Sequence, residues 1–275
     1  MTRIKLGLCQ MNVVDNKKEN LNKATLMIEE CVSKDADFIV LPEMFICPYS
    51  NDKFIEYGEE EQTSTTLKHI SKLANENDVY ILAGSIPEKE SDKLFNTSYL
   101  FDKNGKIIAK HRKMHLFDID VKDKIAFKES DVLTAGDNVT IAETEFGKIG
   151  LGICYDVRFP ELARLMVRKG ALILCYPGAF NMTTGPAHWE LLFRSRALDN
   201  QVFCVGVAPA LNKDASYHSF GHSIIANPWG KVSSQASEKE ELIISEIDLD
   251  EINKIREELP LLKNKRDDLY EVKRK

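Results

Sequence analysis

The sequence predicts a layered α/β domain with two packed β-sheets. Apolar runs of strand length outnumber segments of helical periodicity, and many predicted strands follow one another in pairs, which favours two sheets over a simple doubly wound sheet. Hydrophobic residues make up 43% of the 275 residues, enough for a sizeable core. Neither a repeat nor a low-complexity linker divides the sequence. We therefore expect one domain over residues 1–275, with a core at about 4–247 and a C-terminal helix and tail at 249–275.

The charge balance argues against two classes of partner, and the cysteine pattern indicates a reducing compartment. The formal net charge is −6, and no basic cluster stands out apart from a tail of mixed charge, so we expect neither a nucleic-acid nor a membrane partner. No apolar run reaches the length of about 18 residues that a membrane span needs, and the N-terminal residues are too polar for a signal peptide. The six cysteines are scattered and form no CxxC pair, which is typical of reduced thiols and predicts a cytoplasmic protein.

The first half of the chain alternates predicted strands and helices. The run 38–41 is wholly apolar and is typical of a buried strand, and Asn104-Gly105 favours a tight turn between the arms of a hairpin. Residues 114–138 form a long connection, and loops of this length in a compact domain tend to bind ligands. The predicted strands are 4–13, 38–41, 79–83, 98–101 and 106–109, and the predicted helices are 20–32 and 63–77.

The second half continues this alternation. Pro160 suits the first turn of a helix, and Pro228-Trp229-Gly230 separates the arms of a second hairpin. The predicted strands are 139–143, 148–153, 171–175, 202–207, 223–227, 231–234 and 242–247, and the predicted helices are 160–169, 184–199 and 250–258.

Cys154 lies where a predicted buried strand ends and a helix is about to begin. A side chain at this place is held by a rigid element and points into the crevice where open α/β sheets bind their ligands. Gly150 and Gly152 allow neighbouring groups to approach the backbone just before the thiol. The ordinary alternative is a buried cysteine that only fills space, so further charged groups are needed to favour reactivity.

Two charged residues also follow predicted strands. Glu43 comes after the run 38–41 and is bracketed by apolar residues, which should hold its carboxylate away from water. Lys113 follows the second arm of the first hairpin. A surface glutamate and a solvated lysine are the ordinary alternatives. Together with Cys154, however, these residues supply a base, a cation and a nucleophile.

This set of groups can carry out nucleophilic catalysis. The Glu43 carboxylate can take the thiol proton in step with attack by sulfur. Lys113 and a backbone N–H directly after Cys154, that of Tyr155, can stabilise the developing oxyanion. A second acid such as Glu129 can orient Lys113 and balance its charge, because a buried ammonium without a partner tends to neutralise.

Three separate motifs give the chain its resemblance to a known family. They are Leu41–Phe45 around the glutamate, His111–Phe117 around the lysine and Gly152–Glu161 around the cysteine. From about residue 4 to residue 270 the chain resembles the carbon–nitrogen hydrolase (nitrilase) superfamily, whose active sites hold a Glu-Lys-Cys triad and an accessory glutamate, matched here by Glu129. Within it, the run Tyr176–Glu190 is most similar to the omega-amidases.

The resemblance implies a fold and a reaction. The fold is a four-layer α-β-β-α sandwich that forms a homodimer, with the C-terminal helix and tail packing at the dimer interface. The reaction is hydrolysis of the terminal amide of 2-oxoglutaramate, and of 2-oxosuccinamate, to the dicarboxylate and ammonia through a cysteine thioester, with no metal and no cofactor. One departure is Cys47, where omega-amidases usually have a small polar residue, and it bears on substrate preference.

The substrate's distant carboxylate needs donors, for which the sequence offers several candidates. Arg158, Asn181 and His188 are the polar candidates, with Phe117 and Phe180 as apolar neighbours in the same motifs. Arg158 has the alternative of a structural ion pair.

Other hypotheses compete with this interpretation. A Cys-His hydrolase would use His115 or His188 as the base. A metal site could form from His218 and His222 with Asp118 or Asp120. A non-catalytic binding module could keep the same fold. A deaminated glutathione amidase, or a nitrile-cleaving enzyme, would use the same triad on another substrate.

Overall fold

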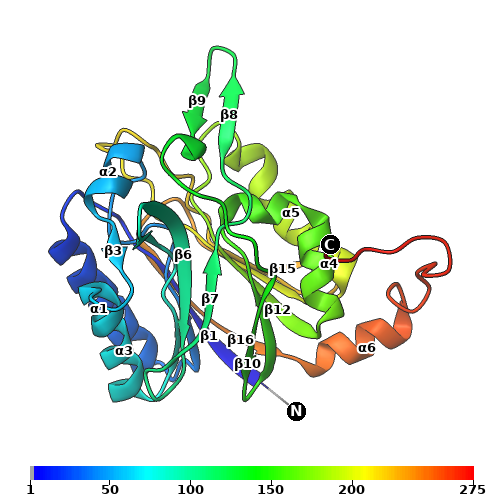
Figure 1. Cartoon of the computed structure of the whole chain (residues 1–275). Coiled ribbons are helices and arrows are strands. Elements are labelled where there is room, and N and C mark those ends of the chain that lie inside the picture. Colours follow the sequence, from blue (N-terminus) through cyan, green and yellow to red (C-terminus); the bar gives the residue numbers. More distant parts are fainter. Residues whose placement is uncertain (1–2) are drawn as a thin grey trace.

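The computed structural model describes residues 3–275 as two β-sheets packed face to face, with helices on both outer faces (Figure 1). Met1 and Thr2, which the expected domain includes, lie outside the described residues. The family fold expected from the sequence, a mixed α/β sandwich with two sheets, is confirmed. Among residues 3–275 no helix is long and apolar enough to cross a bilayer.

The first sheet is built around β1 (Arg3–Gln10), which pairs with β16 (Glu241–Asp248) in antiparallel and with β2 (Phe38–Val40) in parallel orientation. Its strand order is β16-β1-β2-β4-β6-β5-β3, and β7 also pairs with β6. The sheet therefore pairs the first strand of the described chain with its last strand. The remaining strands are β3 (Glu59–Glu60), β4 (Tyr80–Leu82), β5 (Ile86–Glu90), β6 (Lys93–Phe101) and β7 (Ile107–Arg112).

The second sheet has the order β10-β11-β12-β13-β14-β15, with a parallel centre and antiparallel pairs at both edges. The hairpin predicted across Pro228-Trp229-Gly230 is β14 and β15, and the hairpin predicted at Asn104-Gly105 in the first sheet is β6 and β7. The strands are β10 (Thr140–Thr144), β11 (Gly147–Leu151), β12 (Ala171–Pro177), β13 (Phe203–Val207), β14 (Ile224–Ala226) and β15 (Val232–Gln235).

Three helices begin at residues whose side chains favour a helix start. The Asn16 side chain accepts a hydrogen bond from the backbone N–H of Glu19 at the start of α1, and Ser64 does the same for Leu67 in α3. Pro160 occupies the first turn of α4, as expected from its fixed φ. The helices are α1 (Lys17–Ser33), α2 (Asn51–Glu56), α3 (Thr65–Asn77), α4 (Pro160–Arg168), α5 (Gly185–Asn200) and α6 (Asp250–Glu258).

Three apolar clusters correspond to the three contacts between four layers. The cluster between the sheets contains Leu6 and Leu8 of β1 and Ile173 of β12. Another packs α1 and α3 against the outer face of the first sheet, and the third packs α4 and α5 against the second sheet. At Gly7 a Cβ would lie 2.5 Å from the sulfur of Cys31, so glycine lets α1 pack closely on β1.

The connection predicted at 114–138 has structure of its own. It contains an antiparallel hairpin of β8 (Asp118–Val121) and β9 (Ile125–Lys128), followed by the 3₁₀ helix η1 (Glu129–Asp131). This hairpin projects from the body of the molecule (Figure 1). The sequence predicted a long connecting loop here, and the hairpin within it was missed because its turn lacks the glycine that marks a tight turn.

Candidate active site

Four side chains from four segments meet between the two sheets. Glu43 follows β2 and Lys113 follows β7, both in the first sheet. Cys154 begins the 3₁₀ helix η2 (Cys154–Arg158) after β11 of the second sheet, and Glu129 begins η1. Glu43, Lys113 and Glu129 are fully buried, and Cys154 is 4% exposed. The structure therefore brings together the four residues that the sequence singled out.

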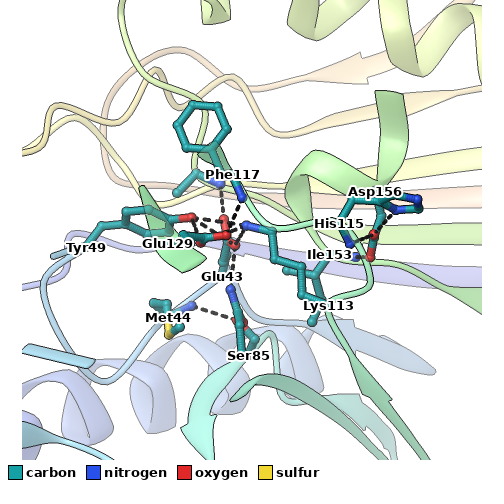
Figure 2. A network of polar contacts seen from close by, with 12 residues as sticks. Glu43, Met44, Tyr49, Ser85, Lys113, His115, Phe117, Glu129, Ile153 and Asp156 are labelled. Atoms are coloured by element: carbon teal, nitrogen blue, oxygen red, sulfur yellow. Dashed lines mark hydrogen bonds and ion pairs between the residues drawn. The ribbon is translucent and has the colours of Figure 1, made fainter. Parts of the chain in front are cut away.

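Lys113 is the centre of this cluster (Figure 2). Its Nζ lies 3.0 Å from Glu43 Oε1, 2.9 Å from Glu129 Oε1 and 3.2 Å from the Tyr49 hydroxyl. An ammonium has three N–H donors, so all three have an acceptor. Burial alone would lower the pKa of Lys113, but the carboxylates of Glu129 and Glu43 outweigh it and raise this pKa above its usual value. The lysine is a permanent cation.

Glu43 is held by several donors besides Lys113. Its Oε1 accepts a hydrogen bond from Asn96 Nδ2 at 2.8 Å, and its Oε2 accepts one from the backbone N–H of Ala179 at 2.7 Å. The nearby Cys154 thiol interacts with this carboxylate and lowers its pKa. Burial raises the pKa of Glu43, although the charge of Lys113 opposes the shift. A carboxylate of this kind can accept a proton and return it at neutral pH.

Cys154 has an unusual backbone conformation and a protonated thiol. Its φ is +47°, in the left-handed region that a side chain rarely adopts, and such strain is concentrated at functional sites. The chain at Gly178 passes so close that a Cβ there would lie 3.1 Å from Cys154 Cα. Burial and the Glu43 carboxylate raise the pKa of the thiol well above its usual value. The sulfur can therefore attack only when a base takes its proton.

Tyr155 directly follows the thiol in the first turn of η2. The first backbone hydrogen bond of this turn runs from the N–H of Asp156 to the carbonyl of Ile153. The N–H of Tyr155 precedes it, at a position where a helix has no acceptor of its own for the donor. The Tyr155 ring contacts Phe117, whose own N–H donates to Glu129 Oε2 at 2.6 Å.

Arg158 is a cation without a carboxylate partner. Its guanidinium lies 4.6 Å from the centroid of the Phe180 ring and 5.4 Å from that of Tyr155, and Nη1 is 3.1 Å from Nδ1 of His188. Its Nε is buried and has no hydrogen-bond partner. Among residues 3–275 no aspartate or glutamate forms an ion pair with it. The alternative of a structural ion pair thus lacks a partner.

Asn181 and His188 have structural partners that the sequence did not reveal. Asn181 Oδ1 accepts hydrogen bonds from the backbone N–H groups of Thr183 and Thr184, which orders the chain before α5, whereas its buried Nδ2 has no partner. Burial and the cation of Arg158 lower the pKa of His188, so that its neutral ring can accept a hydrogen bond from Arg158.

The histidines proposed for competing mechanisms lie elsewhere. His115 Nδ1 is 2.7 Å from Asp156 Oδ1, and His188 is engaged by Arg158, so neither is hydrogen-bonded to Cys154. Nδ1 of His222 and Nε2 of His218 face backbone carbonyls. In the part of the chain that the structure describes, no three His, Cys, Asp or Glu side chains are grouped as metal ligands.

Sequence reasoning missed three polar residues that complete the site. Tyr49 contacts both carboxylates and Lys113, and Asn96 contacts Glu43. Asp156 links η2, which begins with Cys154, to the residues that follow Lys113, since it accepts hydrogen bonds from the backbone N–H groups of Ile153 and His115. The only signal in the sequence was the polarity of these residues within apolar stretches. Tyr49 also lines a small cavity of about 30 Å³ with Glu43 and Cys47.

The family follows from comparison with known proteins. A family model described as carbon-nitrogen hydrolase matches residues 5–257, and the chain belongs to this family.

Within this family, the chain is similar to omega-amidases and to a solved nitrilase-superfamily structure. The chain is similar to the omega-amidase of Xenopus tropicalis, with 48% identity over 275 residues that cover 100% of this chain and 99% of the relative. It is also similar to the chloroplastic omega-amidase of Arabidopsis thaliana, with 46% identity over 99% of this chain and 75% of the relative. Among solved structures, Saccharomyces cerevisiae Nit3, a member of branch 10 of the nitrilase superfamily, superposes with a TM-score of 0.89 at 43% identity, covering 96% of this chain and 97% of the other.

Proposed function

We propose that this protein is an omega-amidase, which hydrolyses the terminal amide of 2-oxoglutaramate, and of 2-oxosuccinamate, to the dicarboxylate and ammonia. Similarity to omega-amidases over the full length of the chain supports this activity. The observation that carries the chemistry is the buried contact of one thiol, one carboxylate and one ammonium at Cys154, Glu43 and Lys113.

The first half of the proposed reaction forms a thioester. Glu43 accepts the proton of Cys154 as the sulfur attacks the amide carbon, and the carbonyl oxygen becomes an oxyanion. Lys113 and the N–H of Tyr155 stabilise this oxyanion. When the intermediate collapses, the C–N bond breaks and Glu43 gives its proton to the leaving nitrogen, which departs as ammonia.

The second half hydrolyses the thioester. Glu43 takes a proton from a water molecule as its oxygen attacks the thioester carbon. The C–S bond then breaks, the proton returns to the sulfur of Cys154, and the product leaves as a carboxylic acid that ionises. Glu129 orients Lys113 throughout through the 2.9 Å contact between its Oε1 and Nζ. Every proton transfer uses the chain's own residues and water.

We assign recognition of the distant carboxylate to Arg158. Its unpaired, half-buried guanidinium and its free Nε offer the charge and the donors that a carboxylate needs. The rings of Phe180 and Tyr155 fix its orientation, with Phe117 beside them. The free Nδ2 of Asn181 is a further donor in this region, and His188 supports Arg158.

We also propose that the chain is a single domain that works as a homodimer. Leu191 and Leu198 of α5 are 63% and 40% exposed, and Trp229 beside them is 53% exposed, so α5 presents an apolar surface that a second copy can cover. The tail adds exposed Leu269 and Tyr270, consistent with the expected interface at residues 249–275. The cytoplasmic location stays a prediction, because the Arabidopsis relative is chloroplastic.

A panel of short amides and a nitrile tests the proposed function. Ammonia release is measured for 2-oxoglutaramate, 2-oxosuccinamate, deaminated glutathione and a simple aliphatic nitrile, with Cys154→Ala as the blank. We expect the two oxo-amides to give the highest kcat/KM and the blank to be inactive. Faster turnover of deaminated glutathione or of the nitrile, or activity in the blank, would contradict the proposal.

A further inference from the structure

The Tyr49 hydroxyl contacts Lys113 and both of its carboxylate partners. Its oxygen lies 2.6 Å from Glu129 Oε1, 3.2 Å from Lys113 Nζ and 3.3 Å from Glu43 Oε1 (Figure 2). The side chain is buried, and its ring packs against those of Phe54 and Tyr217, with centroid distances of 5.1 and 4.7 Å. The aromatic contacts fix the position of the hydroxyl.

The distances decide the direction of these hydrogen bonds. A phenol has one proton, and a separation of 2.6 Å is that of a strong bond to a charged acceptor, so this proton goes to Glu129. Lys113 then donates to the phenol oxygen. Burial and the neighbouring carboxylates raise the pKa of Tyr49 well above its usual value, so the hydroxyl keeps its proton. The titratable groups that face it are Glu43, Lys113, Glu129, Cys154 and Tyr217.

This arrangement matters because Lys113 has no spare donor at rest. Two of its N–H groups bind the carboxylates of Glu43 and Glu129, and the third binds Tyr49. An oxyanion that forms beside Lys113 needs one of the three. Of these three acceptors the phenol oxygen is the neutral one, and it lacks the Coulomb attraction that a carboxylate adds to its hydrogen bond with an ammonium. The bond to Tyr49 is therefore the one whose exchange costs least.

We propose that Tyr49 is a positioning residue of this active site. Its oxygen holds the third N–H of Lys113 until the oxyanion of the tetrahedral intermediate replaces it. Its proton, donated to Glu129, leaves Glu43 as the carboxylate that exchanges protons with Cys154. The inference rests on the proposed amidase function but names a different residue and a different step.

Tyr49→Phe removes the hydroxyl and keeps the ring. We expect kcat for 2-oxoglutaramate to fall about 10-fold or more with KM changed less than about twofold, because the hydroxyl acts on the transition state rather than on substrate binding. The matched control is Tyr57→Phe, which removes a hydroxyl that donates to Asp15 at 2.7 Å outside the site. It should keep both kcat and KM.

A double-mutant cycle with Glu129→Gln supplies a second, independent readout. If Tyr49 acts through Glu129 and Lys113, Tyr49→Phe should add little to the loss caused by Glu129→Gln. Thermal melting verifies that the variants are folded. A Tyr49→Phe protein that matches Tyr57→Phe, or losses that simply multiply in the cycle, would overturn the inference. If the wild type prefers another short amide, the same comparison is made on that amide; a wild type that hydrolyses no amide refutes the proposed function instead.

Discussion

Two fully buried carboxylates, those of Glu43 and Asp156, have pKa values that are shifted in opposite directions. The pKa of Glu43 is raised, whereas the pKa of Asp156 lies well below its usual value. Burial would raise both. Asp156 accepts four N–H donors, two from the backbone of Ile153 and His115 and two from the rings of His111 and His115. These bonds stabilise its charge and outweigh burial.

Glu43 has three N–H donors, those of Asn96, Lys113 and Ala179, and a competitor for one of them. It shares the ammonium of Lys113 with the second carboxylate, Glu129, whose charge contributes to the raised pKa. The comparison teaches that this fold separates two tasks. Asp156 joins the segments of Cys154 and Lys113 through a carboxylate whose lowered pKa keeps it ionised near neutral pH, whereas the raised pKa of Glu43 allows this carboxylate to take a proton.

The largest expected effect comes from removing the titrating carboxylate. Glu43→Gln should lower kcat by about 10³-fold, because general base catalysis contributes 10²–10⁴-fold and an amide cannot accept the thiol proton. Ammonia release at saturating substrate measures it. Glu59→Gln is the control and should keep kcat. Glu59 lies in β3, and its carboxylate accepts hydrogen bonds from Thr66 at the start of α3. Equal losses in the two variants would show that Glu43 has only a structural role.

Next in size is the loss of the carboxylate that does not titrate. Asp156→Asn should lower the free energy of unfolding by about 3 kcal/mol, because an amide NH₂ would face N–H donors in a buried site. Urea unfolding measures the change. The exposed Asp120→Asn on β8 is the control and should stay within about 0.5 kcal/mol of the wild type.

The sign of the pH dependence further tests this cluster. A carboxylate with a depressed folded-state pKa adds stability that is present above its unfolded pKa of about 3.9 and is lost as the pH falls toward its folded pKa. The stability gap between wild type and Asp156→Asn should therefore shrink as the pH falls below about 4. A gap that widens in acid would contradict this account of Asp156.

A third charged group sharpens the comparison, since Arg158, unlike Lys113, forms no ion pair with a carboxylate among residues 3–275. Arg158→Gln should lower kcat/KM for 2-oxoglutaramate by about 10- to 100-fold, as expected for a lost charged hydrogen bond of about 1.5–3 kcal/mol. Turnover of propionamide, which lacks the distant carboxylate, should change little. A similar loss on both amides would place Arg158 outside substrate recognition.

The smallest effect is expected at the edge of the Asp156 cluster. Thr140 Oγ1 lies 3.0 Å from His111 Nδ1, so Thr140→Val removes one partner of a buried ring. We expect a loss of about 1 kcal/mol in unfolding free energy and an unchanged kcat. Urea unfolding and steady-state kinetics on the same preparation decide this, and a large fall in kcat would mean that the cluster takes part in the chemistry.

The sequence predicted the four central residues of the site because each has a local signal. Glu43 and Cys154 follow apolar runs that are typical of buried strands, Lys113 follows the second arm of a predicted hairpin, and Glu129 lies in a loop of functional length. The alternation of strands and helices likewise predicted the layers. These features depend on residues close together in the chain.

The residues that were missed depend on contacts across the fold. Tyr49 meets Glu129 over 80 residues, and Asp156 meets His111 over 45, through the packing of one sheet on the other. No spacing of residues along the sequence predicts such a contact. The hairpin β8–β9 was missed for a local reason, because its turn uses Asp123 with φ of +59° where a glycine would have marked it.

The most direct test of the central claim is the pH dependence of alkylation of Cys154 by iodoacetamide, followed by intact mass, with Cys154→Ala as the blank. If Glu43 is the base for the thiol, the wild type should react at neutral pH, with a midpoint above the usual glutamate pKa of about 4.3. Glu43→Gln should then react only as the pH approaches thiolate formation, because burial keeps the thiol protonated. Identical profiles for the two proteins would contradict the account.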